Sequence, residues 1–383
     1  MNQRFYSLDV FRGATVALMI LVNNPGSWGH IYDPLKHAYW HGCTPTDLVF
    51  PFFLFAVGNA MAFVLPKLEA AGPAVFWKKV LKRTFLIFLI GILLNLFPFV
   101  LYNAEGNLVM KKIETLRIMG VLQRIAICYF VASVMLYYLK PKGTFVASAF
   151  LLLAYWFVCI ATNSSDPYSL HGWFGTNIDI HLLGKQHLYK GEGIPFDPEG
   201  LMSSFAAIVQ VVFGYMAGHY ILTKGKTPEM LNGLFVAGTL LVFTGFVWDM
   251  QFPINKKIWT SSYTVYTTGL ALMVLSMMIY SIEFKNQRGA WSRFFDVFGK
   301  NALFIFVLSG ALPRLLALIR IPNGISDTGK NKFLTPFNWV YEKICKPIFE
   351  EPRNGSLLYA LLFICLMWLI AWWMDKKKIY IKV

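Results

Sequence analysis

The feature that most constrains this sequence is a series of apolar stretches, each close to the roughly 20 residues that a helix needs to cross a bilayer. They lie at about 7 to 24, 46 to 65, 84 to 102, 118 to 139, 144 to 161, 201 to 222, 231 to 249, 263 to 283, 301 to 319 and 356 to 374. Backbone polar groups cannot stay unpaired in hydrocarbon, so such segments span as helices. Only 14% of the 383 residues are charged, against about 25% in soluble domains. The sequence therefore predicts an all-α, polytopic membrane bundle of about ten helices, forming one domain over residues 1–383.

Lys and Arg residues fall unevenly between alternate loops. If the N-terminus is cytoplasmic, the inner segments hold 19 of the 35 basic residues but only 6 of the 20 acidic residues. An excess of Lys and Arg marks the cytoplasmic side, so both termini are predicted to be cytoplasmic. Basic inner loops usually face anionic lipid. The net charge of +15 is therefore interpreted as a sign of membrane lipid, and not nucleic acid, as a partner.

Three of the predicted outer segments are long, at residues 162–200, 250–262 and 320–355. The segment 162–200 contains Gly, Pro, three His and several aromatic residues, so it is neither low-complexity nor linker-like. Binding and catalytic residues concentrate on loops that a rigid scaffold positions. We therefore expect function on the outer side, with residues 162–200 folded over the bundle as a cap.

A histidine lies in the polar and aromatic loop between the first two apolar stretches. His37 is titratable near neutral pH, so a position at the membrane surface suits acid/base chemistry. The run Thr44–Asp47 is typical of a helix start, with Thr44 as the N-cap and Asp47 as the acid of a capping box. Asp47 is also a carboxylate close enough in sequence to orient His37. The two roles of Asp47 are compatible.

Charged and polar residues also lie within the predicted spans. Arg12, three residues after Asp9, is either a snorkelling partner of a helix-start acid or a phosphate ligand. Gln123 and Arg124 lie inside the fourth span. An unpaired Arg at that depth costs at least about 2.5 kcal/mol, so it must face protein, water or a bound anion. A structural salt bridge from Arg124 to Asp9 or Asp47 is the alternative.

The outer segments offer two further groups of polar residues. His171, His181 and His187 are accompanied by Asp179 and Asp197, but their spacings match no zinc pattern, so no metal is predicted.

The run from Asn255 to Trp259 places cations and an indole on the outer side. These residues suit a sugar or a carboxylate, and they equally suit an interfacial belt.

Taken together, these motifs resemble the heparan-α-glucosaminide N-acetyltransferases, a family of transmembrane acetyltransferases, and in particular their shorter bacterial members. The resemblance runs in order through most of the chain. It is carried by residues 7–13, 36–42, 47–53, 120–124, 183–200, 253–259 and 299–302. His41 and Cys43 depart from the pattern of the lysosomal member, so the resemblance does not imply its polymer substrate.

The resemblance implies transfer of an acetyl group from cytoplasmic acetyl-CoA to the amine of a glucosamine-type sugar on the far side of the membrane. The family's active-site histidine falls on His37, which acts as a general base or as an acetylated nucleophile, and the asparagine near the donor acetyl falls on Asn23. Asp47 completes the expected catalytic set. The residues expected to bind the cofactor are Arg12, Gln123, Arg124, Lys300 and Asn301. Those expected to bind the sugar are His187, Asp197, Asn255, Lys256 and Trp259.

The resemblance also implies location in a bacterial inner membrane, and a homodimer is a candidate assembly. A second class of function stays open at this point. The protein would then be a permease for amino sugars or cell-wall fragments, with its His and Arg residues acting in proton coupling.

Overall fold

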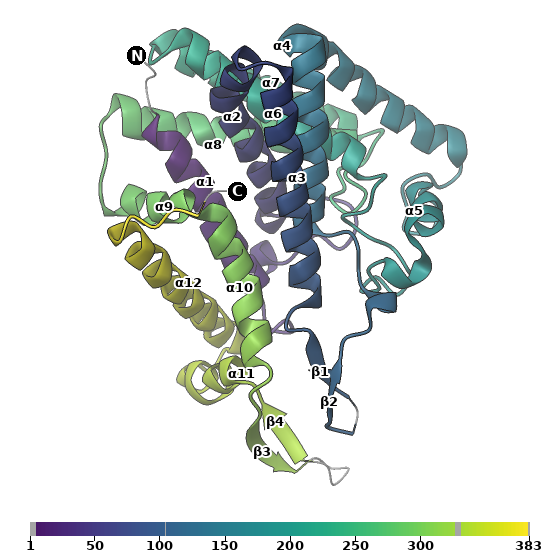
Figure 1. Cartoon of the computed structure of the whole chain (residues 1–383), viewed down its shortest axis with the longest axis vertical. Helices are drawn as coiled ribbons and strands as arrows, with labels where there is room; N and C mark the ends of the chain where they lie inside the picture. Colours follow the sequence, from purple (N-terminus) through teal and green to yellow (C-terminus); the bar gives the residue numbers. More distant parts are fainter. Residues whose placement is uncertain (1–4, 104, 326–330, 382–383) are drawn as a thin grey trace.

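The computed structural model describes residues 5–103, 105–325 and 331–381, and it is mostly helical, as the sequence predicts (Figure 1). The longer helices are α1 (Tyr6–Asn23), α2 (Val49–Ala70), α3 (Pro73–Leu96), α4 (Val121–Thr162), α6 (Ser204–Lys224), α7 (Pro228–Asp249), α8 (Ser261–Ile279), α10 (Ala302–Leu316) and α12 (Pro352–Lys376). The shorter ones are α5 (Gly175–Leu183), α9 (Ala290–Lys300) and α11 (Pro336–Val340).

In the described residues, seven helices are long and apolar enough to cross a membrane, or eight if the bent pair α9 and α10 is taken as one span. The predicted count of about ten spans is therefore not confirmed. One reason is α4, which contains two of the predicted stretches within 42 residues and leaves helical geometry at Lys140, next to Pro141. Another is the break between α9 and α10, whose axes differ by 81°.

Helix α3 begins and ends earlier in the sequence than the predicted apolar stretch at about 84 to 102. It begins with Pro73 at the first helical position, where the missing proline N–H costs nothing. It ends at Leu96, before Pro98, which lacks the N–H needed to continue a helix. The basic run Lys78–Arg83 is therefore helical, although the hydropathy pattern places it in a loop.

Two small antiparallel hairpins, which the sequence analysis does not anticipate, extend from the bundle. Strand β1 (Val100–Tyr102) pairs with β2 (Leu108–Met110), and β3 (Ile321–Ile325) pairs with β4 (Asn331–Leu334). Both project from the lower end of the molecule in Figure 1. The hydroxyl of Tyr102 donates to the carbonyl of Leu318 at 3.0 Å, and the guanidinium of Arg320 lies 3.3 Å from the centre of the Tyr102 ring. These contacts hold the two hairpins together.

The termini of the described chain lie at the same end of the bundle. Arg12 in α1 donates through Nε to the carbonyl of Gly299 in α9 at 2.9 Å. Lys300, the next residue, forms an ion pair with Asp375 near the end of α12 at 3.1 Å. The early turns of α1 and the last turns of α12 therefore meet around α9. Which side of the membrane they face stays a prediction.

Helices α2 and α6 pack with their backbones in close approach. A Cβ on Gly58 of α2 would collide with the carbonyl oxygen of Val211 in α6, and a Cβ on Gly214 of α6 would collide with the carbonyl oxygen of Phe55. Small residues permit such close packing of helices in membranes. This contact positions the start of α2 beside the segment that leads into α6, where the polar residues of the site gather.

Replacing Gly58 with Ala should therefore destabilise the protein strongly, because a rigid backbone carbonyl cannot move away from the new methyl group. Overpacking of this kind costs about 1–3 kcal/mol or more. Gly310→Ala is the matched control, because the nearest atom to its added Cβ would be 3.8 Å away. Thermal unfolding in detergent should show a lower midpoint for Gly58→Ala alone, and equal midpoints for the two variants would contradict this packing.

Candidate active site

The carboxylate of Asp47 organises the loop that leads into α2. A short 3₁₀ turn (Pro45–Leu48) precedes the helix, and Asp47 in that turn is 1% exposed. Its Oδ2 accepts hydrogen bonds from the backbone N–H groups of Ala38 and Thr44, each at 3.0 Å. Because a buried carboxylate needs such partners, these bonds draw residues 38–44 into a compact loop. The capping box expected at this helix start is observed.

The same carboxylate also contacts His37. Oδ1 of Asp47 lies 2.7 Å from Nδ1 of His37, and the side chain of His37 is 43% exposed. A neutral imidazole that donates Nδ1–H to a carboxylate keeps an unprotonated Nε2. The pair therefore presents a proton acceptor at the surface of the site, as the sequence analysis expects from these two residues.

Lys256 approaches this pair from the segment between α7 and α8. Its Nζ lies 3.0 Å from Nδ1 and 3.5 Å from Nε2 of His37, and 3.5 Å from Oδ1 of Asp47. Burial lowers the pKa of Lys256, while the negative charges of Asp47 and Glu199 partly offset this effect. Asp47, His37 and Lys256 thus form a titratable triplet of carboxylate, imidazole and amine. Lys256 follows His37 by 219 positions in the sequence, so the fold brings them together.

These residues line one cavity of about 260 Å³, called here the His37 cavity. Its walls carry both signs of charge as well as aromatic rings. The charged and titratable residues that line it are His37, Asp47, Arg117, Arg124, Tyr189, Glu192, Glu199, Lys256 and Lys257. Such a mixture suits a polar ligand that carries hydroxyl, amine and anionic groups.

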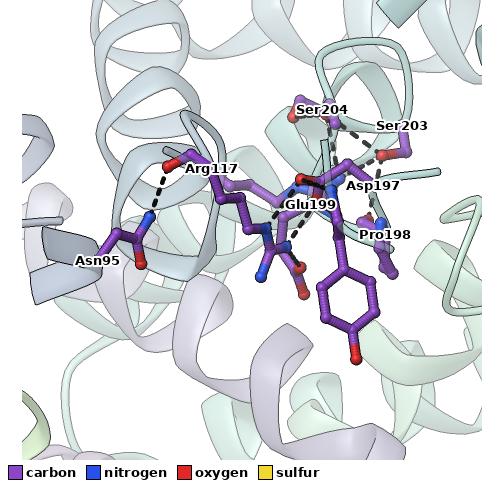
Figure 2. A network of polar contacts seen from close by, with 10 residues as sticks. Asn95, Arg117, Asp197, Pro198, Glu199, Ser203 and Ser204 are labelled. Carbon is purple, nitrogen blue, oxygen red and sulfur yellow. Dashed lines mark hydrogen bonds and ion pairs between the residues drawn. The ribbon is translucent and has the colours of Figure 1, made fainter. Parts of the chain in front are cut away.

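Arg117, just before α4, holds two acidic residues of the outer segment (Figure 2). Its Nε and Nη2 donate to the two carboxylate oxygens of Asp197 at 2.9 and 2.6 Å, and Nη2 also donates to Glu199 at 2.5 Å. Burial alone would raise the pKa of Glu199, but the charges of Arg117 and Arg124 outweigh it and hold that pKa below its usual value. The side-chain amide of Asn95 donates to the carbonyl of Arg117 at 2.9 Å.

Sequence reasoning missed both Arg117 and Glu199 as site residues. An available signal was the acidic pair Asp197 and Glu199, which needs a cation when buried. Arg117 stands between two apolar residues, Leu116 and Ile118, directly before an apolar span. It was therefore a candidate cation for Asp197 and Glu199.

Arg124 lies fully buried in the first turn of α4. Its Nη2 donates to the carbonyl of Gly200 at 3.2 Å and to the hydroxyl of Ser203, and its guanidinium lies 5.0 Å from the ring centre of Trp259. The alternative of a salt bridge to Asp9 or Asp47 is wrong, because those carboxylates pair with Arg12 and with His37 and Lys256. Among the described residues, Nε and Nη1 of Arg124 have no hydrogen-bond partner.

The predicted cofactor ligands do not all lie together. Arg12 and Lys300 line a second cavity of about 820 Å³, called here the terminal cavity, with Arg288 and Tyr380. There Arg12 pairs with Asp9 at 2.7 Å.

Lys300 is paired with Asp296 at 2.8 Å. Asn301 binds the backbone of Ile379 and Ile381, so it fastens the chain after α12. Gln123 points toward Gly91 in α3 and is not among the residues that line either cavity. Only Arg124 of the predicted cofactor set joins His37.

The predicted sugar ligands are also divided. Lys256 and Trp259 line the His37 cavity. Trp259 is fully buried against Phe50, so the interfacial-belt alternative does not hold. Asn255 is buried and accepts the N–H of Ile258 at 3.1 Å, which shapes the local turn.

Three further predicted residues lie apart from the cavity lining. Nδ1 of His187 lies 2.7 Å from the carbonyl oxygen of Leu116, and Asp197 is buried behind Arg117. Asn23 is exposed at the end of α1. In the described residues, no three His, Cys, Asp or Glu side chains form a group that could hold a metal ion.

These features define an integral membrane helical protein with a buried charged site at one end of the bundle. The family model of the catalytic part of heparan-alpha-glucosaminide N-acetyltransferase matches residues 4–178. Over 99% of its length, the chain is 28% identical to the human heparan-alpha-glucosaminide N-acetyltransferase and 26% identical to the mouse protein of the same name. The alignment spans 60% of each relative. These matches confirm the resemblance to the heparan-α-glucosaminide N-acetyltransferase family that the motifs indicate.

Arg117→Ala should destabilise the protein by about 3–5 kcal/mol, because it leaves the buried carboxylates of Asp197 and Glu199 without their cation. Arg117→Lys should recover only part of this loss, since a point charge does not reproduce a planar two-pronged donor. Thermal unfolding in detergent measures both effects. Lys190→Ala is the control, because Lys190 is exposed and lies in the outer segment that also contains Asp197 and Glu199. An Arg117→Ala midpoint equal to that of the control would show that the cluster contributes little.

Proposed function

We propose that the protein transfers an acetyl group from cytoplasmic acetyl-CoA to the amine of a glucosamine-type sugar on the outer side of the membrane. The observation that carries the proposal is the contact between His37 and the buried Asp47 inside a charged cavity. Support comes from the relatives, which are named as N-acetyltransferases acting on a glucosaminide.

In this proposal the neutral amine of the sugar attacks the thioester carbonyl and His37 takes the proton that the nitrogen loses. The C–S bond breaks, and coenzyme A leaves as a thiolate. Asp47 holds the imidazole with Nε2 free and stabilises the imidazolium that forms. Positioned general bases contribute about 10²–10⁴-fold to rate. A route through an acetylated His37 is the alternative within the same site, because imidazole is itself a nucleophile. Asn23 as a donor to the developing oxyanion is carried by the family resemblance alone.

Acetyl-CoA is a polyanion with a nearly neutral arm, so the acetyl end alone needs to approach the outer site. The terminal cavity offers Arg12, Arg288 and Lys300, which suit phosphate groups once their acidic partners are displaced or shared. At the other site, Arg124 has two unpartnered donors in the described structure and lines the His37 cavity. We assign it to an anionic or carbonyl group of a substrate near the reacting atoms.

A permease for amino sugars is the competing function, and a measurement of thioester consumption separates the two. Transport needs sealed vesicles, whereas acetyl transfer by purified protein proceeds in detergent. The bundle's charged cavity and the names of the relatives favour the enzyme.

The proposal is tested in sealed vesicles of known orientation. Acetyl-CoA on the face that carries the termini should acetylate an impermeant amino sugar on the opposite face, and His37→Ala should slow this at least about 100-fold. His171→Ala, at an exposed histidine of the outer segment, should be as active as the unmodified protein. Product formed only when both substrates share one face would contradict transfer across the membrane. Near-normal turnover by His37→Ala would contradict the role of His37.

A further inference from the structure

Two adjacent lysines line the His37 cavity in contrasting surroundings. The side chains of Lys256 and Lys257 are equally exposed, at 19% each. Lys257 forms a close ion pair with Glu192 at 2.6 Å. Lys256 instead places Nζ 3.0 and 3.5 Å from the two ring nitrogens of His37. The pair offers a built-in comparison between a lysine with a close carboxylate partner and one whose nearest group is a histidine, with the Asp47 carboxylate at 3.5 Å.

The proton count around His37 favours a neutral Lys256. Nδ1 of His37 carries at most one proton, and the carboxylate of Asp47 takes it at 2.7 Å. An ammonium on Lys256 would then find no acceptor in Nδ1 at 3.0 Å and would depend on Oδ1 of Asp47 at 3.5 Å. An amine can instead present its lone pair to the ring, and the proton that the ammonium gives up has an acceptor in Nε2 at 3.5 Å.

Other charges around Lys256 act in both directions. The carboxylates of Asp47 and Glu199 favour the ammonium, whereas burial disfavours it and dominates, so the pKa of Lys256 lies below its ordinary value. A lysine whose pKa is lowered has a larger neutral, nucleophilic fraction at a given pH than an ordinary lysine.

We propose that Lys256 is a site of self-acetylation, at which its neutral amine takes the acetyl group when no sugar is bound. The proposal rests on the function proposed above, because acetyl-CoA is the donor. The lysine nitrogen attacks the thioester carbonyl, a C–N bond forms, and the C–S bond breaks. Coenzyme A leaves as a thiolate. The one proton that the nitrogen loses on becoming an amide passes to Nε2 of His37.

The same product arises if His37 is acetylated first. The amine of Lys256 then attacks the acetyl carbon on the ring nitrogen, and the imidazole is the leaving group. Nζ lies 3.5 Å from Nε2, so an acetyl carbon bonded to that ring nitrogen would be adjacent to the amine that attacks it. Either route neutralises Lys256 and adds an acetyl group inside a 260 Å³ cavity, so it should exclude the sugar.

The test is incubation of the purified full-length protein with isotopically labelled acetyl-CoA in detergent, with and without an amino sugar, followed by peptide mass spectrometry. Label should enter Lys256 at least about tenfold faster than Lys257, because Nζ of Lys256 lies 3.5 Å from Nε2 of His37 and a positioned proton acceptor contributes about 10²–10⁴-fold to rate. The sugar should suppress this label. Preincubation without sugar should inactivate the protein in step with labelling of Lys256, and Lys256→Arg should not become labelled at that position. Equal labelling of both lysines would overturn the proposal.

A donor-independent arm separates this inference from the proposed function. Limiting p-nitrophenyl acetate acetylates exposed neutral amines without any need for a coenzyme site, and Lys256 should again exceed Lys257. If the sugar is acetylated but neither donor labels Lys256, self-acetylation is wrong and the proposed function stands. If p-nitrophenyl acetate labels Lys256 but acetyl-CoA yields no acetylated sugar and no acetylated lysine, the acetyltransferase proposal fails and the self-acetylation proposal fails with it.

Discussion

A single buried carboxylate, that of Asp47, connects the fold to the site. It accepts two backbone N–H groups that close the loop before α2, and its other oxygen contacts His37. The carbonyl of the same residue accepts the hydroxyl of Tyr263 in α8 at 2.5 Å, which ties the start of α2 to a distant helix. A buried charge is tolerated when it is paired and hydrogen-bonded. Replacing this carboxylate would therefore loosen the loop, the histidine and the approach of Lys256 together.

The remaining charges fall into two groups with different surroundings. In the His37 cavity, Arg117 is held by Asp197 and Glu199, while Arg124 keeps donors that no described residue uses. In the terminal cavity, Arg12 and Lys300 are each paired with acidic residues. Asn23, which lies outside both cavities, follows Arg12 by eleven positions of α1, a rise of roughly 16 Å along the helix. In the proposed reaction, a long donor extends from the terminal cavity toward the His37 cavity.

Much of this architecture is accessible from the sequence because it is local. Apolar stretches locate the helices, and the Thr44–Asp47 run identifies both a helix start and a partner for His37. The break at Lys140 is accessible as well, because the loop expected between two apolar stretches coincides with the kink that divides α4 into two helical arms. The hairpin strands are three to five residues long and carry too little periodicity to be detected.

Long-range pairings were out of reach for a different reason. Arg117 and Asp197 are 80 residues apart, and nothing local in either segment specifies the other. Trp259 looks like an interfacial aromatic, because its burial depends on Phe50 and Arg124 from other helices. The approach of Lys256 to His37 likewise exists only once α2 and α8 have packed.

The central claim, that Asp47 organises the site, is tested most directly by hydrogen–deuterium exchange that resolves the backbone amides of Ala38 and Thr44. In Asp47→Asn these amides lose an ionised acceptor, so they should exchange faster than in the unmodified protein, while the β1–β2 hairpin keeps its rate. Asp33→Asn is the matched control, because this carboxylate is 80% exposed in the same loop and pairs with Lys36. Unchanged protection of Ala38 and Thr44 in Asp47→Asn would contradict the account.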